Sequence, residues 1–176
     1  MKSNDVFIFS KASGVSALYA VLAEKKIIPK SKVAYYLKKY PLASSKVPGV
    51  FVSTGSLGHG IAIAAGVAFA DRTRDVYCLI SDAEVQEGSM WSSILFARHH
   101  KLENLKVIVD KNGLQACGRT RDIIDIDVPL YKLQQLFPIE VVYTVKGKGI
   151  RFMESDNSWH YRNLTKEEME NALCQI

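Results

Sequence analysis

The sequence lacks the long apolar segments and targeting features that would place it in a membrane or direct it across one. No stretch of its 176 residues approaches the ~20 consecutive apolar residues that a membrane-spanning helix needs. The apolar run at 6–9 is too short for the hydrophobic core of a secretory signal. We therefore expect a cytoplasmic protein that has no membrane partner.

Cysteine is also scarce, since Cys78, Cys117 and Cys174 are the only three and lie far apart. An odd number of widely spaced cysteines argues against a disulfide framework and against a zinc site, and indicates a reducing compartment. Apolar residues make up 48% of the chain and charged residues 23%, which is the composition of a globular domain with a sizeable core. We expect residues 1–176 to form a single domain.

A continuous basic run is missing, although the formal net charge is +5. Lysine and arginine occur in pairs, such as Lys25 with Lys26 and Lys38 with Lys39, and no nucleic-acid motif accompanies them. We therefore do not expect a nucleic-acid partner. An anionic small-molecule ligand suits the same excess of positive charge.

Hydrophobic periodicity predicts alternating helices and short apolar strands. Helices are expected at 10–27, 32–40, within 52–70, at 84–102 and at 166–175, and strands at 74–81, 105–111 and 139–145. The expected buried side of the helix at 84–102 consists of Met90, Trp91, Ile94, Leu95 and Ala97. Thr165 and Glu168 form a capping box before the final helix. The pattern indicates an α/β fold with a doubly wound, mainly parallel sheet and helices on both faces.

Oxygen-bearing side chains follow two of these strands. Asp82 follows the strand at 74–81, and Asn112 follows the strand at 105–111. Because a crossover helix joins the two strands, they are parallel and end at the same edge of the sheet, where open α/β folds bind ligands. A carboxylate and an amide oxygen suit Mg²⁺, which is usually held by one or two protein groups together with phosphate and water. The structural alternative is that Asp82 caps a helix and Asn112 adopts a left-handed turn conformation before Gly113.

Two further segments could contact an anion. The segment 53–60 reads S-T-G-S-L-G-H-G, and its glycines either free backbone N–H groups to face an anion or form a turn before a core helix. The basic loop at 146–149 is either an anion contact or a solvated turn. The pair His99 and His100 is expected at the surface or at an interface rather than at a metal.

The order of several segments resembles the N-terminal, diphosphate-binding domain of the transketolase family. The matching segments are S-T-G-S-L-G-H-G at 53–60, Q-E-G-S-M-W at 86–91, H-K-L-E-N-L at 100–105, V-I-V-D-K-N-G-L-Q at 107–115 and T-V-K-G-K-G-I at 144–150. The resemblance covers 7–160. It implies a thiamine diphosphate-binding fold, with thiamine diphosphate and Mg²⁺ held at an interface between this domain and a pyrimidine-binding domain.

The resemblance also implies roles for individual residues. Asp82 and Asn112 match the magnesium ligands, and Leu114 matches the residue that adds a backbone carbonyl. The positions implied along the cofactor are Gly55, Leu57, Ala83 and His160. Of these, Ala83 would place its amide against the diphosphate, and His160 is the implied catalytic residue near the diphosphate and the substrate. Glu84 and Glu87 match acidic positions near the family's dimer contact, or are ordinary first-turn glutamates.

The chain departs from the family pattern in several places. The family's G-D-G is replaced by Ser81-Asp82-Ala83, and alanine would be strained if that turn required a positive φ. The family's S-K-G-H ends here on Ser13, and the loop at 40–46 carries no histidine. The domain is shortened, and the glutamate that activates the cofactor belongs to a pyrimidine domain that this chain does not contain.

These features predict one subunit of a split thiamine diphosphate-dependent enzyme. It would transfer a two-carbon ketol or related acyl-anion unit, as part of a homo- or hetero-oligomer. A separate chain would carry the pyrimidine and C-terminal domains. The alternative is a degenerate, non-catalytic transketolase-like domain that acts as an interaction or regulatory module and binds no cofactor.

Overall fold

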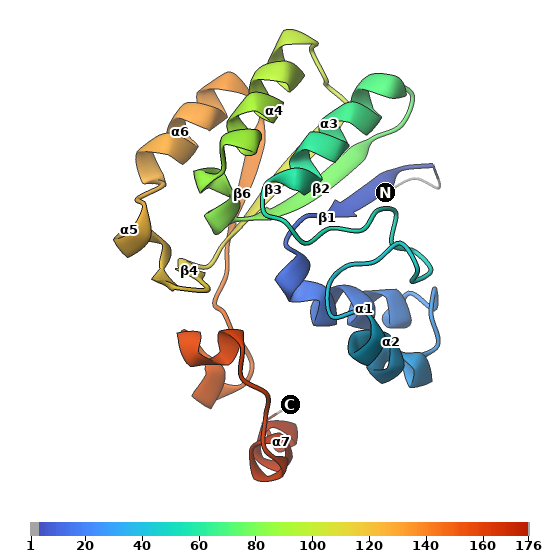
Figure 1. Cartoon of the computed structure of the whole chain (residues 1–176), viewed down its shortest axis with the longest axis vertical. Helices are drawn as coiled ribbons and strands as arrows, with labels where there is room; N and C mark the ends of the chain where they lie inside the picture. Colours follow the sequence, from blue (N-terminus) through green and yellow to red (C-terminus); the bar gives the residue numbers. More distant parts are fainter. Residues whose placement is uncertain (1–3, 176) are drawn as a thin grey trace.

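A four-stranded parallel sheet forms the centre of the molecule (Figure 1). The computed structural model describes residues 4–175. The strands lie in the order β1-β2-β3-β6, and their bounds are β1 Val6–Phe9, β2 Val76–Ser81, β3 Leu105–Lys111 and β6 Ile139–Tyr143. Each neighbouring pair is parallel. All four strands therefore end at one side of the sheet, called the carboxyl edge below, and begin at the opposite amino edge.

One face of the sheet is covered by α3 (His59–Ala70), α4 (Gly88–His99) and α6 (Asp127–Leu136). Side chains alternate between the two faces of a strand, so every second residue of β2 points to these helices. Val76, Cys78 and Ile80 are accordingly fully buried in the main core. The predicted parallel α/β architecture is confirmed.

The other face carries α1 (Val15–Glu24), with α2 (Val33–Lys39) packed on α1. Phe9 of β1 lies in the same buried cluster as Tyr19 of α1, and Leu79 of β2 packs against that cluster. The aromatic ring of Tyr19 is completely buried, and its hydroxyl donates to the carbonyl of Leu42 at 3.2 Å. Helices therefore cover both faces of the sheet, as the sequence predicts.

Shorter elements complete the chain. They are the 3₁₀ helices η1 Ala12–Gly14, η2 Lys30–Lys32, η3 Asp82–Gln86, η4 Arg151–Met153 and η5 Asn157–His160, the strands β4 Leu114–Gln115 and β5 Gly118–Arg119, and the helices α5 Thr120–Ile123 and α7 Lys166–Leu173. Strands β4 and β5 pair antiparallel beyond the carboxyl edge. Among residues 4–175, no helix combines the length and apolar character needed to cross a membrane.

The predicted helix at 84–102 is two elements, because Glu87 is extended (φ −81°, ψ 133°) and separates η3 from α4. The buried side of α4 runs through Met90, Ile94 and Ala97, which are spaced as one helical face. Leu95 lies one residue further round the helix and is 54% exposed, so its predicted burial is wrong. Strand β1 and helix α6 have no counterpart among the predicted elements.

The remaining predictions hold with smaller shifts. The strand at 105–111 is confirmed to the residue, and the capping box of Thr165 and Glu168 is present. The first helix is shorter than expected, because the chain from 12 to 14 forms a 3₁₀ turn before α1 begins.

Candidate functional site

Asp82 begins η3 directly after β2, and the residue is only 1% exposed. Its Oδ1 accepts a hydrogen bond from the Ala83 amide at 2.9 Å, and its Oδ2 accepts from the Gly113 amide at 2.7 Å and the Thr120 hydroxyl at 3.3 Å. Burial raises the pKa of the Asp82 carboxyl, and these bonds and the charge of Lys11 oppose the rise. A bound cation would offset the cost of burying this charge.

Asn112 follows β3, and its Oδ1 accepts a hydrogen bond from the Leu114 amide at 2.9 Å. The left-handed position in this turn belongs to Gly113 (φ 74°), whereas Asn112 does not have a positive φ. Ser81, not Asp82, is the N-cap residue of η3. Both structural alternatives are therefore wrong: Asp82 is not the cap of η3, and Asn112 does not adopt the left-handed conformation.

Asp82, Asn112 and Leu114 line one cavity of about 420 Å³ at the carboxyl edge. The structure thus brings together the three residues expected to hold a metal. Among residues 4–175, no group of three or more His, Cys, Asp or Glu side chains is placed to hold a metal ion. A cation here would depend on one carboxylate, one amide oxygen and a backbone carbonyl, which fits Mg²⁺ when phosphate and water complete its coordination.

The buried side-chain oxygen of Gln115 is the buried side-chain polar atom in the described part of the chain that has no hydrogen-bond partner. Such an atom costs free energy unless something else donates to it. Gln115 follows Leu114 in β4 but does not line the cavity that contains Asp82. The fit to a polar, metal-bound cofactor therefore rests on the oxygen donors of Asp82, Asn112 and Leu114.

The missing glycines around Asp82 cause no backbone strain. Ala83 is not among the described residues with a positive φ, so alanine adopts this turn freely. Its N–H is already bonded to Asp82 Oδ1. Ser81 uses its side chain in a capping box with Glu84, which accounts for a serine at this position.

Glu84 is completely buried, and both of its carboxylate oxygens are used within the chain. Oε2 accepts from the Ser81 amide at 2.8 Å, and Oε1 accepts from the Gly58 amide at 3.0 Å and from the Ser10 hydroxyl. Of the two interpretations of this residue, the structure favours a first-turn glutamate that is internal to the domain. Gly55 and Leu57 precede Gly58 in an exposed loop and do not line the cavity that contains Asp82.

Three basic side chains, those of Lys11, Lys146 and His160, lie close to one another at the carboxyl edge. The Nζ of Lys146 lies 2.8 Å from Nδ1 of His160, and the Nζ of Lys11 pairs with Asp110 at 2.5 Å. Burial and the charges of Lys146 and Lys11 lower the pKa of His160. Burial and the charge of Lys11 likewise lower the pKa of Lys146, while Asp156 and Asp82 act in the opposite direction.

The loop at 146–149 is a turn in which Lys146 and Gly147 are partly buried and Lys148 and Gly149 are exposed. Besides the contact of Lys146 with His160, a Cβ on Gly147 (φ 79°) would lie 2.3 Å from the Met153 carbonyl oxygen. The sequence gives no role to Lys11, Thr120 or Gln115. Position is a signal for Lys11, which lies shortly after the end of β1, and Gln115 ends the family-like segment at 107–115.

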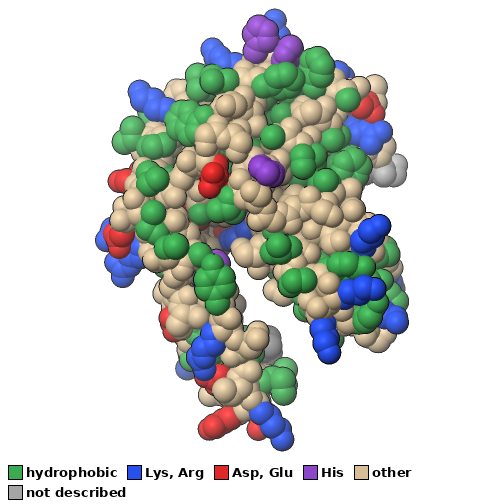
Figure 2. Space-filling model, viewed as in Figure 1, with side chains coloured by type: hydrophobic (Ala, Val, Ile, Leu, Met, Phe, Trp, Pro, Cys, Tyr) green, Lys and Arg blue, Asp and Glu red, His purple; other side chains and the backbone are tan. Residues whose placement is uncertain are grey.

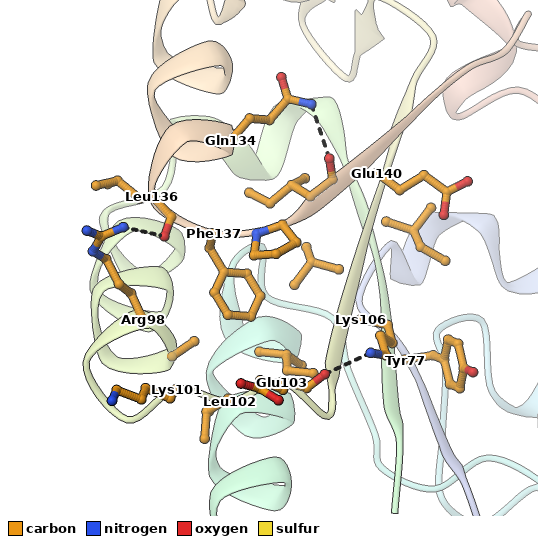
Figure 3. Close-up of a pocket in the computed structure, with 16 residues that line it drawn as sticks. Tyr77, Arg98, Lys101, Leu102, Glu103, Lys106, Gln134, Leu136, Phe137 and Glu140 are labelled. Atoms are coloured by element: carbon orange, nitrogen blue, oxygen red, sulfur yellow. Dashed lines mark hydrogen bonds between the residues drawn. The ribbon is translucent and has the colours of Figure 1, made fainter.

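A larger cavity of about 720 Å³ lies at the amino edge, between the ends of α4 and α6 and the starts of β3 and β6 (Figure 3). Its polar side chains bond to nearby backbone. Arg98 donates to the Leu136 carbonyl at 3.0 Å and Lys106 to the Glu103 carbonyl at 2.7 Å (Figure 3). Among the described residues, no ion pair involves the charged side chains that line this cavity, which are Arg98, Lys101, Glu103, Lys106 and Glu140.

Comparison with known proteins agrees with this geometry. Residues 40–132 match the family model described as "Transketolase, thiamine diphosphate binding domain". The chain is 35% identical to a subunit of apulose-4-phosphate transketolase from Actinobacillus succinogenes, over 98% of this chain and 75% of that protein. It is 31% identical to human transketolase, again over 98% of this chain but over 33% of the longer protein.

The fold is shared with solved transketolases. The crystal structure of transketolase from Campylobacter jejuni superposes with a TM-score of 0.74 at 24% identity, over 97% of this chain and 34% of that one. A structure of transketolase from Pichia stipitis with sedoheptulose-7-phosphate gives the same TM-score of 0.74. The chain belongs to the transketolase family and corresponds to its thiamine diphosphate-binding domain.

Proposed function

We propose that this chain is the diphosphate-binding subunit of a split, thiamine diphosphate-dependent transketolase-like enzyme. The observation that carries the proposal is the meeting of Asp82, Asn112 and Leu114 at one cavity. In the proposed complex these residues hold Mg²⁺, and the metal anchors the diphosphate. The cofactor, when bound, supplies the carbanion-stabilising chemistry that transfer of a two-carbon ketol or acyl-anion unit requires.

The chain's own residues would bind and orient the anionic groups. Lys11 and Lys146 bring positive charge close to Asp82, as their effects on pKa indicate, and His160 contacts Lys146. The lowered pKa values of His160 and Lys146 favour their neutral forms over the charged ones. We assign the catalytic contact to His160, and contacts along the cofactor to Gly55, Leu57 and Ala83.

A separate chain would supply the pyrimidine and C-terminal domains. The names of two relatives support this arrangement, because each describes its protein as one subunit of an apulose-4-phosphate transketolase. The outer face of α3 and α4 offers a surface for such a partner, or for a second copy of this chain. Hydrophobic side chains gather there (Figure 2), and Phe69, Leu95 and Phe96 are 46%, 54% and 37% exposed. Helix α3 carries no charged residue, which is unusual for a helix that faces solvent on one side.

Calorimetric titration with thiamine diphosphate tests the proposal directly. We expect heat of binding only when Mg²⁺ is present, and tighter binding when the partner chain is added. A folded protein that binds no cofactor under any of these conditions would instead support the non-catalytic module. We also place the protein in the cytoplasm, because its three cysteines are unpaired and fit a reducing compartment.

A further inference from the structure

We propose that Glu84 is a positioning residue that fixes the turn before α3 against the ends of β1 and β2 and thereby sets the affinity for the cofactor. The inference rests on the proposed function, because it concerns the loop at 55–58 that is assigned to the cofactor. It adds a residue that touches neither metal nor substrate. Glu84 acts instead through the groups that its carboxylate holds in place.

The two carboxylate oxygens of Glu84 contact different segments of the chain. Oε2 stays local and accepts from the amide and the hydroxyl of Ser81, at 2.8 and 3.3 Å, which closes the capping box of η3. Oε1 reaches away from η3, to the Ser10 hydroxyl at the end of β1 and to the Gly58 amide, at 3.0 Å, before α3. One side chain therefore connects three segments that are remote in the sequence.

The side chain of Glu84 is held by hydrogen bonds alone. The residue is 0% exposed, and no ion pair to it occurs among the described residues. Its four contacts are all donors: two backbone amides and two hydroxyls. An ionised carboxylate accepts all of them, whereas an amide would turn its NH₂ group towards at least one donor. The site is therefore specific for a carboxylate, more so than a capping box alone requires.

The turn that Glu84 holds has little freedom of its own. Gly58 is left-handed (φ 78°), and a Cβ there would lie 2.2 Å from the Ser89 hydroxyl. A Cβ on Gly60 would lie 2.3 Å from Ser10 Oγ and 2.8 Å from Ser10 Cα. The start of α3 thus touches the backbone after β1, and Glu84 is bonded to both sides of this contact.

The same short element also carries the candidate metal ligand, since Asp82 and Glu84 both lie in η3. Their side chains bond to different segments. Asp82 is bonded to Gly113 and Thr120 beyond β3, whereas Glu84 is bonded to the segments after β1 and before α3. Loss of the Glu84 contacts would leave the hydrogen bonds of Asp82 in place and release the turn at Gly58, which follows the residues assigned to the cofactor.

The test compares Glu84→Gln with Glu168→Gln. Glu168 closes the other capping box of the chain, where it accepts from the Thr165 amide at 2.8 Å, but it has no contact with the loop at 55–58. We expect Glu84→Gln to weaken thiamine diphosphate binding in the presence of Mg²⁺ by about 10- to 100-fold, as removal of a supporting residue commonly does at metal sites. Glu168→Gln should bind like the wild type.

Amide hydrogen exchange on the cofactor-free protein supplies a second readout. We expect faster exchange at 58–60 in Glu84→Gln, with the centre of β3 unchanged. A core variant at the opposite, amino edge, Leu102→Ala, controls for lost stability and should retain affinity at a temperature where both variants are folded. Equal losses of affinity in Glu84→Gln and Leu102→Ala would indicate a purely structural role and overturn the proposal.

The remaining outcomes are also decisive. Wild-type affinity in Glu84→Gln, beside normal binding by the wild type, overturns only this inference, whereas no binding by the wild type overturns the proposed function and this inference with it. If Glu84→Gln does not fold, Ser10→Ala removes one donor to Oε1 and leaves the capping box intact. That variant should bind the cofactor more weakly than the wild type, and unchanged affinity would overturn the proposal.

Discussion

The two edges of the sheet differ in how their polar side chains are used. At the amino edge, around the larger cavity, Arg98, Lys106 and Gln134 each donate to a backbone carbonyl nearby. At the carboxyl edge, groups from separate segments bond to one another, as Glu84 does with Ser10 and Gly58. At the amino edge these side chains bond to backbone carbonyls, whereas at the carboxyl edge one buried side chain fixes several segments relative to one another.

This difference favours the carboxyl edge as the candidate site, although the cavity there is the smaller of the two. The cavity at the amino edge is about 720 Å³ and the one at the carboxyl edge about 420 Å³, yet only the smaller contains a buried carboxylate with a raised pKa. Perturbed titratable groups that share a cavity are a mark of functional sites. The following predictions separate the roles of the two edges.

The largest effect is expected at Asp82. Asp82→Ala removes the only carboxylate of the candidate metal site, so Mg²⁺-dependent binding of thiamine diphosphate should be abolished in calorimetric titration. Arg98→Ala, at the amino edge, is the control and should bind normally. Normal binding by the Asp82 variant would contradict the assignment of the metal ligand.

Asn104 should have a large effect on stability and none on binding. Its side-chain nitrogen lies 3.0 Å from each of three carbonyl oxygens, those of Ala68, Asp71 and Arg74. Asn104→Ala leaves them without this donor and should lower the free energy of unfolding by about 1–3 kcal/mol. Urea denaturation measures the loss. A change in cofactor affinity in this variant would show that the two edges are coupled.

His160 should give a moderate, pH-dependent effect. Its pKa in the folded protein is below the ordinary value of 6.5, so the unfolded chain binds a proton more readily as the pH falls. Its contribution to stability is therefore fully present above about pH 6.5 and declines below that value. The melting temperature of the wild type should fall more than that of His160→Gln between pH 7 and pH 5.5. Parallel profiles would contradict the lowered pKa.

The smallest effect is expected at Ser13, which stands where the family has a histidine. Ser13 is exposed in the short turn before α1, and a serine there offers the diphosphate little. Ser13→Ala should leave cofactor affinity nearly unchanged in the same titration. A marked loss would mean that the hydroxyl has taken over part of the histidine's role.

Local pattern was sufficient to predict much of the fold. Strand β3 is apolar and bounded by turns, and the capping box before α7 is a four-residue signal, so both were predicted correctly. Strand β1 is not predicted because four residues carry too little periodicity, whereas α6 is missed although Leu130, Leu133 and Leu136 recur at helical spacing. Burial of Leu95 was predicted wrongly because α4 contacts its neighbours over a narrower face than its composition indicates.

The candidate site was predictable only in part. Asp82 and Asn112 could be paired because both follow strands joined by one crossover. The contacts of Glu84 could not be predicted, since they depend on how α3 packs against β1. Ser81-Asp82-Ala83 was identified as a departure from the family, but only the backbone conformation could indicate that Ala83 is unstrained.

The bond between Ser10 and Glu84 joins residues 74 positions apart, so it has a consequence for folding. A contact of such long sequence separation forms only after β1, α3 and β2 have come together, because the intervening loop must first be closed. The site is therefore absent from a partly folded chain in which these three elements have not yet assembled. A ligand that binds it would stabilise the native domain as a whole, and the gain would grow with the logarithm of ligand concentration.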